Sequence, residues 1–269
     1  MSVYRELPMR TRQIQAFNTA TKSDNKIHDD EVARRFGFTG GLVPGVDVYG
    51  YLSWGPVSEW GIDWLERGTA ETRFGSPTYD GQTVSVEWDE PRAVLRNPDG
   101  VEVAWLEATL ADRAPRLDPA AHGVGELPEP EARPDASEAS LPQGLVLGAV
   151  GRRFSYAQEG ERYLADARET LDLYVRERVA HPAWLLRFAN EVLARNVVLG
   201  PWIHVGSRIE NLAVVRDGQM VQCRASVVAN YERKGHRFVD LDVVVLADDQ
   251  PVNRIAHTAI YLPRQVAAA

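Results

Sequence analysis

A short pattern recurs in the two halves of the chain at a constant offset. Asp80-Gly81-Gln82 returns as Asp217-Gly218-Gln219. The same offset of 137 positions (217 − 80 and 181 − 44) aligns Val43-Pro44-Gly45 with Ala180-His181-Pro182. One match of three residues can arise by chance, but two elements at one offset indicate a duplication. The chain is therefore expected to fold as two similar units in tandem.

Each unit is expected to contain one long apolar helix. Residues 43–66 are apolar on nearly all sides, and a helix of this kind is normally buried, here inside a curved sheet. Gly50, Gly55 and Pro56 interrupt the pattern, so we expect a kink or break near Gly55. In the second half, the residues from His181 to about position 198 predict the equivalent helix.

Strand patterns follow each helix. In the first half they occur at 71–74, 84–88, 93–95 and 101–110, and the last two flank a turn of the sequence Asn97-Pro98-Asp99-Gly100. Such a turn between apolar runs predicts a hairpin, and the set predicts an antiparallel meander. In the second half the patterns occur at 202–209, 220–231, 237–246 and 254–262. The expected fold class is α+β, with an antiparallel sheet wrapped around a long helix in each half.

The segment 114–141 differs in composition from both halves. It is rich in Pro, Ala, Glu and Gly and poor in large apolar residues, which is typical of a linker or surface crossover. We therefore expect an N-terminal unit at 1–113, a crossover at 114–142 and a C-terminal unit at 143–269.

Charge and composition exclude several classes of function. The net charge is −8, which disfavours nucleic acid and anionic membranes as partners, although a local basic patch could still hold a phosphorylated handle. Cys223 is the only cysteine, so no intramolecular disulfide can form. The sequence has no spacing typical of a zinc site and no P-loop, so no cofactor is expected. Without an apolar leader or a long apolar span, the expected location is cytoplasmic.

A polar cluster precedes the first long helix. It includes Asn25 and His28 and is followed by a short helical pattern at 30–36 and a glycine-rich run that ends at Gly45. Histidine exchanges protons near neutral pH, and the backbone N–H groups at a helix start can receive negative charge. The cluster is therefore the strongest candidate for catalysis or substrate contact, whereas the alternative for His28 is a cap on the short helix.

The same residues resemble the motif Asp-x-Asn-Pro-(Leu/Ile)-His of the MaoC-like, (R)-specific enoyl-CoA hydratase group. Asn25, Ile27 and His28 match the motif, Ala33 matches a following alanine, and Val43-Pro44-Gly45 matches the start of the central helix with one substitution. The resemblance implies a double hotdog fold. It also implies a hydro-lyase, a hydratase or dehydratase, that acts on an acyl thioester of coenzyme A or an acyl carrier protein.

The resemblance also implies roles for individual residues. His28 corresponds to the catalytic acid/base, Asn25 to the residue that positions it, and Gly45 to the donor of a backbone N–H to the thioester carbonyl. Two departures from the family bear on catalysis: Ser23 stands in place of the catalytic aspartate, and Pro44 stands in place of a histidine. Asp24, one position after Ser23, is a candidate for the missing catalytic carboxylate; its alternative is a charge at a helix N-terminus.

Four further residues are candidates for substrate binding. Asp47 lies in the first turn of the apolar helix, where a carboxylate is costly to bury; its alternative is a partner of the helix dipole. Tyr49 is a pocket residue or a core residue. His181 begins the second helix and occupies the position equivalent to Pro44. Trp184 packs in the core or lines a pocket for an acyl chain or ring.

Three functions remain open from the sequence. The first is the hydro-lyase described above. The second is a related enzyme that isomerises or cyclises a biosynthetic intermediate, which is motivated by Ser23, Pro44 and His181. The third is a non-catalytic hotdog subunit that binds a ligand or completes a partner enzyme. A monomer and a homodimer are both compatible with a double unit, because the paired sheet edges are satisfied internally.

Overall fold

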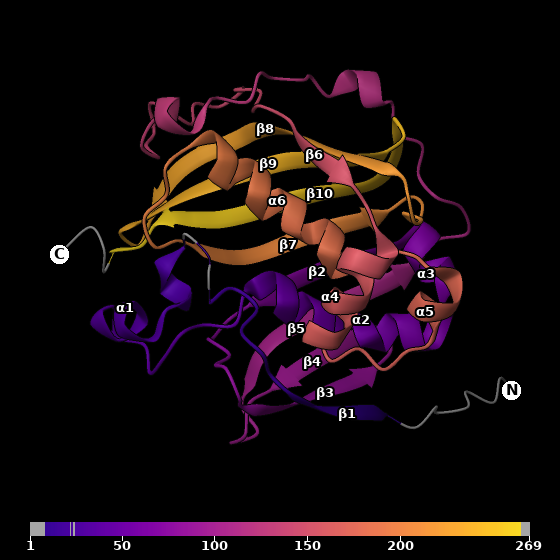
Figure 1. Cartoon of the computed structure of the whole chain (residues 1–269). Coiled ribbons are helices and arrows are strands. Elements are labelled where there is room, and N and C mark those ends of the chain that lie inside the picture. The colour runs from indigo at the N-terminus through magenta and orange to yellow at the C-terminus, as the bar shows by residue number, and fades with distance from the viewer. Residues whose placement is uncertain (1–8, 22, 24, 265–269) are drawn as a thin grey trace, which may run out of the picture.

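The computed structural model describes residues 9–21, 23 and 25–264. Its strands form one ten-stranded sheet in which all neighbours are antiparallel (Figure 1). The strand order is β1-β3-β4-β5-β2-β7-β10-β9-β8-β6. The first-half strands are β1 (Arg10–Gln15), β2 (Gly68–Phe74), β3 (Thr83–Asp89), β4 (Arg92–Arg96) and β5 (Glu102–Leu110). The second-half strands are β6 (Val150–Arg153), β7 (Ile203–Asn211), β8 (Met220–Arg233), β9 (His236–Ala247) and β10 (Gln250–Leu262).

The two halves are arranged symmetrically around the β2–β7 pair. Helix α2 (Gly45–Trp60) and helix α6 (Pro182–Asn196) begin 137 positions apart (182 − 45). Two isolated bridges keep the same offset, since Leu42 pairs with Tyr79 and Val179 pairs with Arg216. The expected architecture of two units, each a long helix on an antiparallel sheet, is confirmed.

The first long helix ends earlier than the sequence suggested. Helix α2 stops at Trp60, and the chain turns at Gly61, whose φ of 57° is easily reached only by glycine, before α3 (Ile62–Arg67) begins. A break near Gly55 is therefore wrong, while the kink expected as its alternative stays a prediction. Gly55 serves a close contact instead, because a Cβ there would lie 2.7 Å from Trp88 Cε3.

The simple meander expected in the first half is also incomplete. Strands β3, β4 and β5 follow one another, but β2 pairs with β5 on the far side and joins the second half through β7. The crossover between the halves carries two short turns, η2 (Pro119–Ala121) and η3 (Pro130–Ala132), and passes beside β8 (Figure 1). The residue boundaries of the two units stay predictions.

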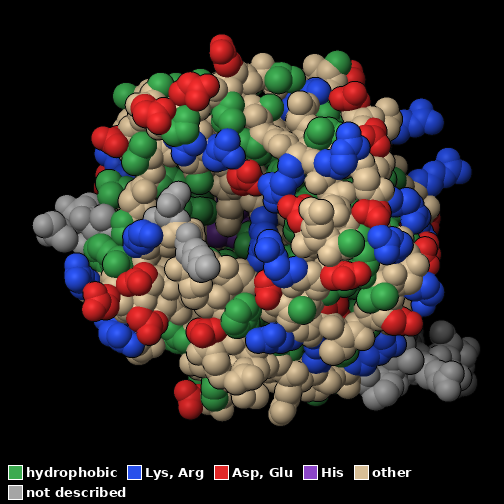
Figure 2. All heavy atoms as spheres, in the orientation of Figure 1, with side chains coloured by type: hydrophobic (Ala, Val, Ile, Leu, Met, Phe, Trp, Pro, Cys, Tyr) green, Lys and Arg blue, Asp and Glu red, His purple; other side chains and the backbone are tan. Residues whose placement is uncertain are grey.

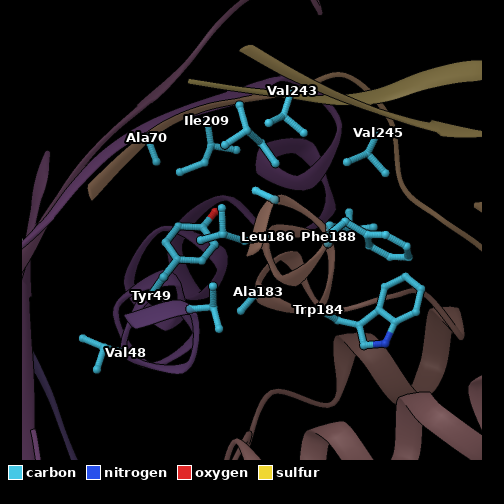
Figure 3. Close-up of a cluster of buried hydrophobic side chains, with 14 of the residues drawn as sticks. Val48, Tyr49, Ala70, Ala183, Trp184, Leu186, Phe188, Ile209, Val243 and Val245 are labelled. Atoms are coloured by element: carbon cyan, nitrogen blue, oxygen red, sulfur yellow. The ribbon is translucent and has the colours of Figure 1, made fainter. Parts of the chain in front are cut away.

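The core lies between the two long helices and the curved sheet. Tyr49, Leu52 and Phe188 are fully buried there, and each such side chain contributes about 1.5–3 kcal/mol by leaving water. Figure 3 shows Tyr49 and Trp184 among these side chains. The remaining helices are short: η1 (Lys26–His28), α1 (Asp30–Arg35), η4 (Tyr156–Gly160), α4 (Glu161–Asp166) and α5 (Leu173–Glu177).

Candidate active site

The polar cluster before α2 is held by local caps. Asn25 caps η1, where its Oδ1 accepts from the Ile27 N–H at 3.4 Å. Asp29 caps α1 by accepting from the backbone of Glu31 and Val32 at 3.0 and 3.1 Å. Short polar side chains before a helix commonly satisfy its free N–H groups in this way. The caps fix the backbone on both sides of His28.

The hydrogen bonds of His28 define its protonation. Its Nδ1 lies 2.7 Å from the Leu42 carbonyl oxygen, which can only accept, so Nδ1 carries the proton. Nε2 is then the basic nitrogen, and it receives only a long contact of 3.4 Å from Asn25 Nδ2. Burial lowers the pKa of His28 below its ordinary value, partly offset by the Leu42 bond and the charge of Asp47. His28 is therefore a neutral imidazole at pH 7 that can accept a proton at Nε2.

Asn25 connects this cluster to the second half of the molecule. Its Nδ2 donates to the Trp202 carbonyl at 3.0 Å, and its Oδ1 accepts from the Trp202 N–H at 3.3 Å. Trp202 directly precedes β7, which is the central strand contributed by the second half. The position of Asn25 thus depends on both halves.

Gly45 begins α2 beside the same cluster. A Cβ at this position would lie 3.1 Å from Phe74 and 3.2 Å from His204 Nδ1, so the close packing favours glycine. Pro44 precedes it and provides no side-chain cap to the first turn. Uncapped N–H groups at a helix start, together with the helix dipole, can stabilise an oxyanion.

Two cavities meet at His28. One of about 240 Å³ has mainly apolar walls, which include Phe38, Leu42, Val48, Phe74, Val205 and Ile260. The other, of about 670 Å³, is lined in part by three arginines: Arg133, Arg152 and Arg187. The residues common to both are Asn25, His28, Pro44, Asn190 and Trp202. Figure 2 shows a hollow on this face, with basic side chains at its rim and a histidine inside. His28 thus lines both the smaller apolar cavity and the larger cavity with arginines in its walls.

Three polar residues in the walls of the apolar cavity were not singled out as site residues from the sequence. They are Thr78, Asn190 and His204, and each has a buried polar atom without a partner among the described residues. His204 lies within the strand pattern at 202–209, which by itself does not distinguish a site residue from a structural one. The available signal was weak: Asn190 is a polar residue within the largely buried helix α6.

The four candidates for substrate binding do not line the two cavities, although Asp47 contacts two residues that line the larger one. Asp47 is 1% exposed and pairs with Arg187 at 2.7 Å, joining α2 to α6. Thr19 also donates to Asp47, at 2.5 Å. Tyr49 and Trp184 are buried in the core, where burial raises the pKa of Tyr49. None of these side chains is among the described residues that line either cavity.

His181 is likewise buried, at the start of α6. Its Nδ1 accepts from the Ala183 N–H at 3.2 Å, and its Nε2 lies 3.3 Å from Glu169 Oε2. Burial would raise the pKa of Glu169, but the hydrogen bond and charge of His181, with Arg12, lower it overall. His181 therefore has a clear structural role, while Asp24 lies outside the described residues.

The described part of the chain offers no group of His, Cys, Asp and Glu side chains able to hold a metal ion. Within that same part, each helix is too short or too polar to cross a membrane.

Comparison with known proteins identifies the fold. No protein-family model matches the sequence, and no curated protein matches it. Among solved structures, a protein described as a MaoC domain dehydratase from Chloroflexus aurantiacus is 11% identical, with a TM-score of 0.64 over 97% of this chain and 96% of its own. A MaoC-like dehydratase is 10% identical, with a TM-score of 0.61 over 94% and 98%.

A third structure has the same architecture. It is a conserved hypothetical protein from Mycobacterium tuberculosis with a double hotdog fold, 13% identical, with a TM-score of 0.61 over 93% of this chain and 96% of its own. At these identities the likeness establishes the fold. This chain is a double hotdog protein, built on the same plan as the MaoC-like dehydratases.

Proposed function

We propose that the protein is a hydro-lyase that adds water to, or removes it from, an acyl thioester carried by coenzyme A or an acyl carrier protein. The observation that carries the proposal is the neutral His28, whose basic Nε2 lies at the junction of two cavities close to the start of α2. The fold shared with MaoC-like dehydratases supports the same reaction class.

In the hydration direction, the acyl group occupies the apolar cavity, with the thioester carbonyl at the Gly45 N–H. His28 Nε2 takes a proton from water as the water oxygen bonds to C3 of the enoyl group. The electron pair of the double bond moves onto the thioester carbonyl, and the Gly45 N–H and the α2 dipole stabilise the resulting enolate. The protonated His28 then returns its proton to C2. The arginines of the larger cavity suit the phosphates of either carrier.

Ser23 favours a second candidate function. It stands where the family has its catalytic aspartate, and its Oγ accepts from the Asn25 N–H at 3.1 Å. The site then holds one side-chain base without a carboxylate at that position. One base beside an oxyanion donor suits isomerisation, in which His28 moves a proton between C2 and C4 of an unsaturated thioester and no water is added.

The test is an assay with trans-2-enoyl-CoA substrates of several chain lengths. Loss of the conjugated absorbance is followed, and the products are separated to distinguish a 3-hydroxyacyl thioester from a shifted double bond. His28→Ala is compared with His236→Ala, a matched change in the β8–β9 hairpin. Turnover that is lost only in His28→Ala supports the proposal. Full activity of His28→Ala, or no turnover of any thioester, would overturn it.

Other expectations accompany this proposal. The substrate is a small-molecule thioester, and neither nucleic acid nor a membrane is required. The enzyme works in the cytoplasm, as a monomer or as a homodimer. Sedimentation of the purified protein would decide between the two assembly states.

A further inference from the structure

The apolar cavity contains more polar groups than a plain hydrocarbon needs. Thr78 Oγ1, Asn190 Oδ1 and His204 Nδ1 are buried, and no described residue forms a hydrogen bond with any of them. Thr78 is 3% exposed and His204 is 5% exposed. Buried polar atoms in proteins are nearly always paired, so several unpaired atoms around one cavity point to a partner supplied from outside the chain.

His204 is held in place by contacts with Ser207, His257 and Phe74. Its Nε2 lies 2.9 Å from Ser207 Oγ, which in turn lies 3.1 Å from His257 Nδ1. The two imidazole rings are tilted by 33° to each other with centroids 4.2 Å apart, and Phe74 packs edge-on against His204 at 4.8 Å. With Nε2 engaged by Ser207, Nδ1 is the nitrogen of this cavity-lining side chain that has no partner among the described residues.

Both histidines are neutral in this environment. Burial, with the charge of His257 as a second cause, holds the pKa of His204 well below its ordinary value. Burial also lowers the pKa of His257 to about 3. A neutral imidazole attracts a neutral hydrogen-bonding group rather than an anion, and Thr78 has the same preference because its hydroxyl both donates and accepts.

A plain alkyl chain would leave these groups unpaired. It would also displace any water that pairs with them, so each would lose its hydrogen bonds on binding. A site built to bond a substrate oxygen rejects the analogue that lacks it far more strongly than an apolar site rejects an added hydroxyl. The polar atoms in these walls therefore select against a purely hydrocarbon occupant.

We propose that the apolar cavity binds an acyl group that carries a hydroxyl or keto oxygen beyond C3, with Thr78 and His204 as its hydrogen-bonding partners. This inference rests on the proposed thioester function and names its substrate class. Asn190, which lines both cavities beside His28, is left to bond the oxygen that is added or removed at C3.

The test compares matched pairs of thioesters. Each pair consists of a saturated acyl-CoA and the same chain with a hydroxyl at one position beyond C3, and binding is measured by calorimetry. A saturated chain cannot be hydrated, so this measurement does not depend on turnover. For the best position we expect the hydroxylated chain to bind at least about tenfold more tightly. The corresponding enoyl pairs are expected to differ similarly in kcat/KM.

Variants assign the effect to the cavity. Thr78→Val preserves the shape of the side chain and is expected to reduce the binding ratio severalfold, as is His204→Gln. Thr69→Val, on the exposed side of β2, is the matched control and should keep the ratio. If plain chains bind as tightly as hydroxylated ones, the inference fails while hydratase activity can stand. If no thioester binds, both the proposed function and the inference fail.

Discussion

The starts of α2 and α6 occupy equivalent positions in the duplicated fold, yet one is open and the other is closed. At α2, Pro44 has no capping side chain, and a cavity reaches the first turn of the helix. At α6, the His181 ring caps the first turn itself. A side chain thus occupies a first-turn N–H group at α6, whereas at α2 no side chain caps the first turn beside the cavity.

The residues around His181 complete the closure. Its ring lies between Tyr163 and Tyr174, with centroid distances of 5.2 and 4.7 Å, and it contacts Glu169. All three neighbours are buried or nearly so. In the first half, Pro44 at the equivalent position lines both cavities at His28. The start of α2 therefore borders cavities lined by both halves, whereas the start of α6 is packed against core side chains.

The largest effect on kcat is expected from removing the imidazole of His28, beside the open start of α2. His28→Ala should lower kcat by about 10²–10⁴-fold, because a positioned general base typically contributes that much. The folded state should persist, since His28 is only partly buried. Steady-state kinetics and circular dichroism check both points. A loss of less than tenfold would mean that the open side is not where the proton is transferred.

A smaller loss of kcat is expected from Gly45→Ala. The added methyl would meet Phe74 and His204 at 3.1–3.2 Å, so these side chains or the start of α2 must move by a few tenths of an ångström, which disturbs the Gly45 N–H. Loss of one oxyanion donor costs about 10²-fold in kcat. Ser53→Ala, a buried change later in the same helix, is the control for general effects on α2. Equal losses in the two variants would argue against the oxyanion role.

A substitution at the closed start of α6 should lower the free energy of unfolding and leave kcat nearly unchanged. His181→Ala removes the cap of α6 and one of the partners of the buried Glu169, which keeps Arg12, so the free energy of unfolding should fall by about 2 kcal/mol. Urea unfolding measures the loss, and kcat should change less than tenfold. A catalytic loss as large as that of His28→Ala would show that the two helix starts still share one function.

The pH dependence should separate His28 from the buried histidines. Because the pKa of His28 is lowered, it stays unprotonated below its ordinary value, and kcat/KM should hold until the pH falls under about 6.5. His204 and His257 also have lowered pKa values, so the unfolded chain binds protons more readily than the folded one. Their contribution to stability is present above pH 6.5 and is lost as the pH falls toward about 3.

The matching variant for this effect is His257→Phe. It should flatten the fall in the free energy of unfolding between about pH 6.5 and 3, measured by urea titration at each pH. An unchanged slope would show that other groups govern acid stability. Of the four effects, this one is expected to be the smallest near neutral pH.

The fold could be predicted from the sequence because its signals are local. The turn residues Asp80-Gly81-Gln82, their repeat at Asp217-Gly218-Gln219, and the apolar periodicity between them set the helix starts and the strands. Gly55 was misjudged because its role depends on Trp88, a residue of a distant strand. A glycine that permits a close contact looks, in sequence, the same as one that breaks a helix.

Only the part of the candidate site that comes from the segment before α2 could be predicted from the sequence. His28, Asn25 and Gly45 lie within one stretch, and their order carries the chemistry. Thr78, Asn190 and His204 come from three separate segments, and only the pairing of β2 with β7 and the packing of α6 bring them to one cavity. No local sequence pattern indicates that these three residues line the same cavity. The roles given to Asp47, Tyr49, His181 and Trp184 at the site stay predictions that the geometry does not favour.

The double contact of Asn25 with Trp202 has a consequence for how the chain reaches its native state. The two residues are 177 positions apart, so their hydrogen bonds close a very long loop. Contacts between distant residues tend to form late, after local elements and nearby pairings. The His28 segment is therefore expected to settle only when both halves have folded and docked. A nascent chain that lacks its last third would contain His28 and the start of α2, but it would not yet contain Trp202, whose hydrogen bonds hold Asn25 in place.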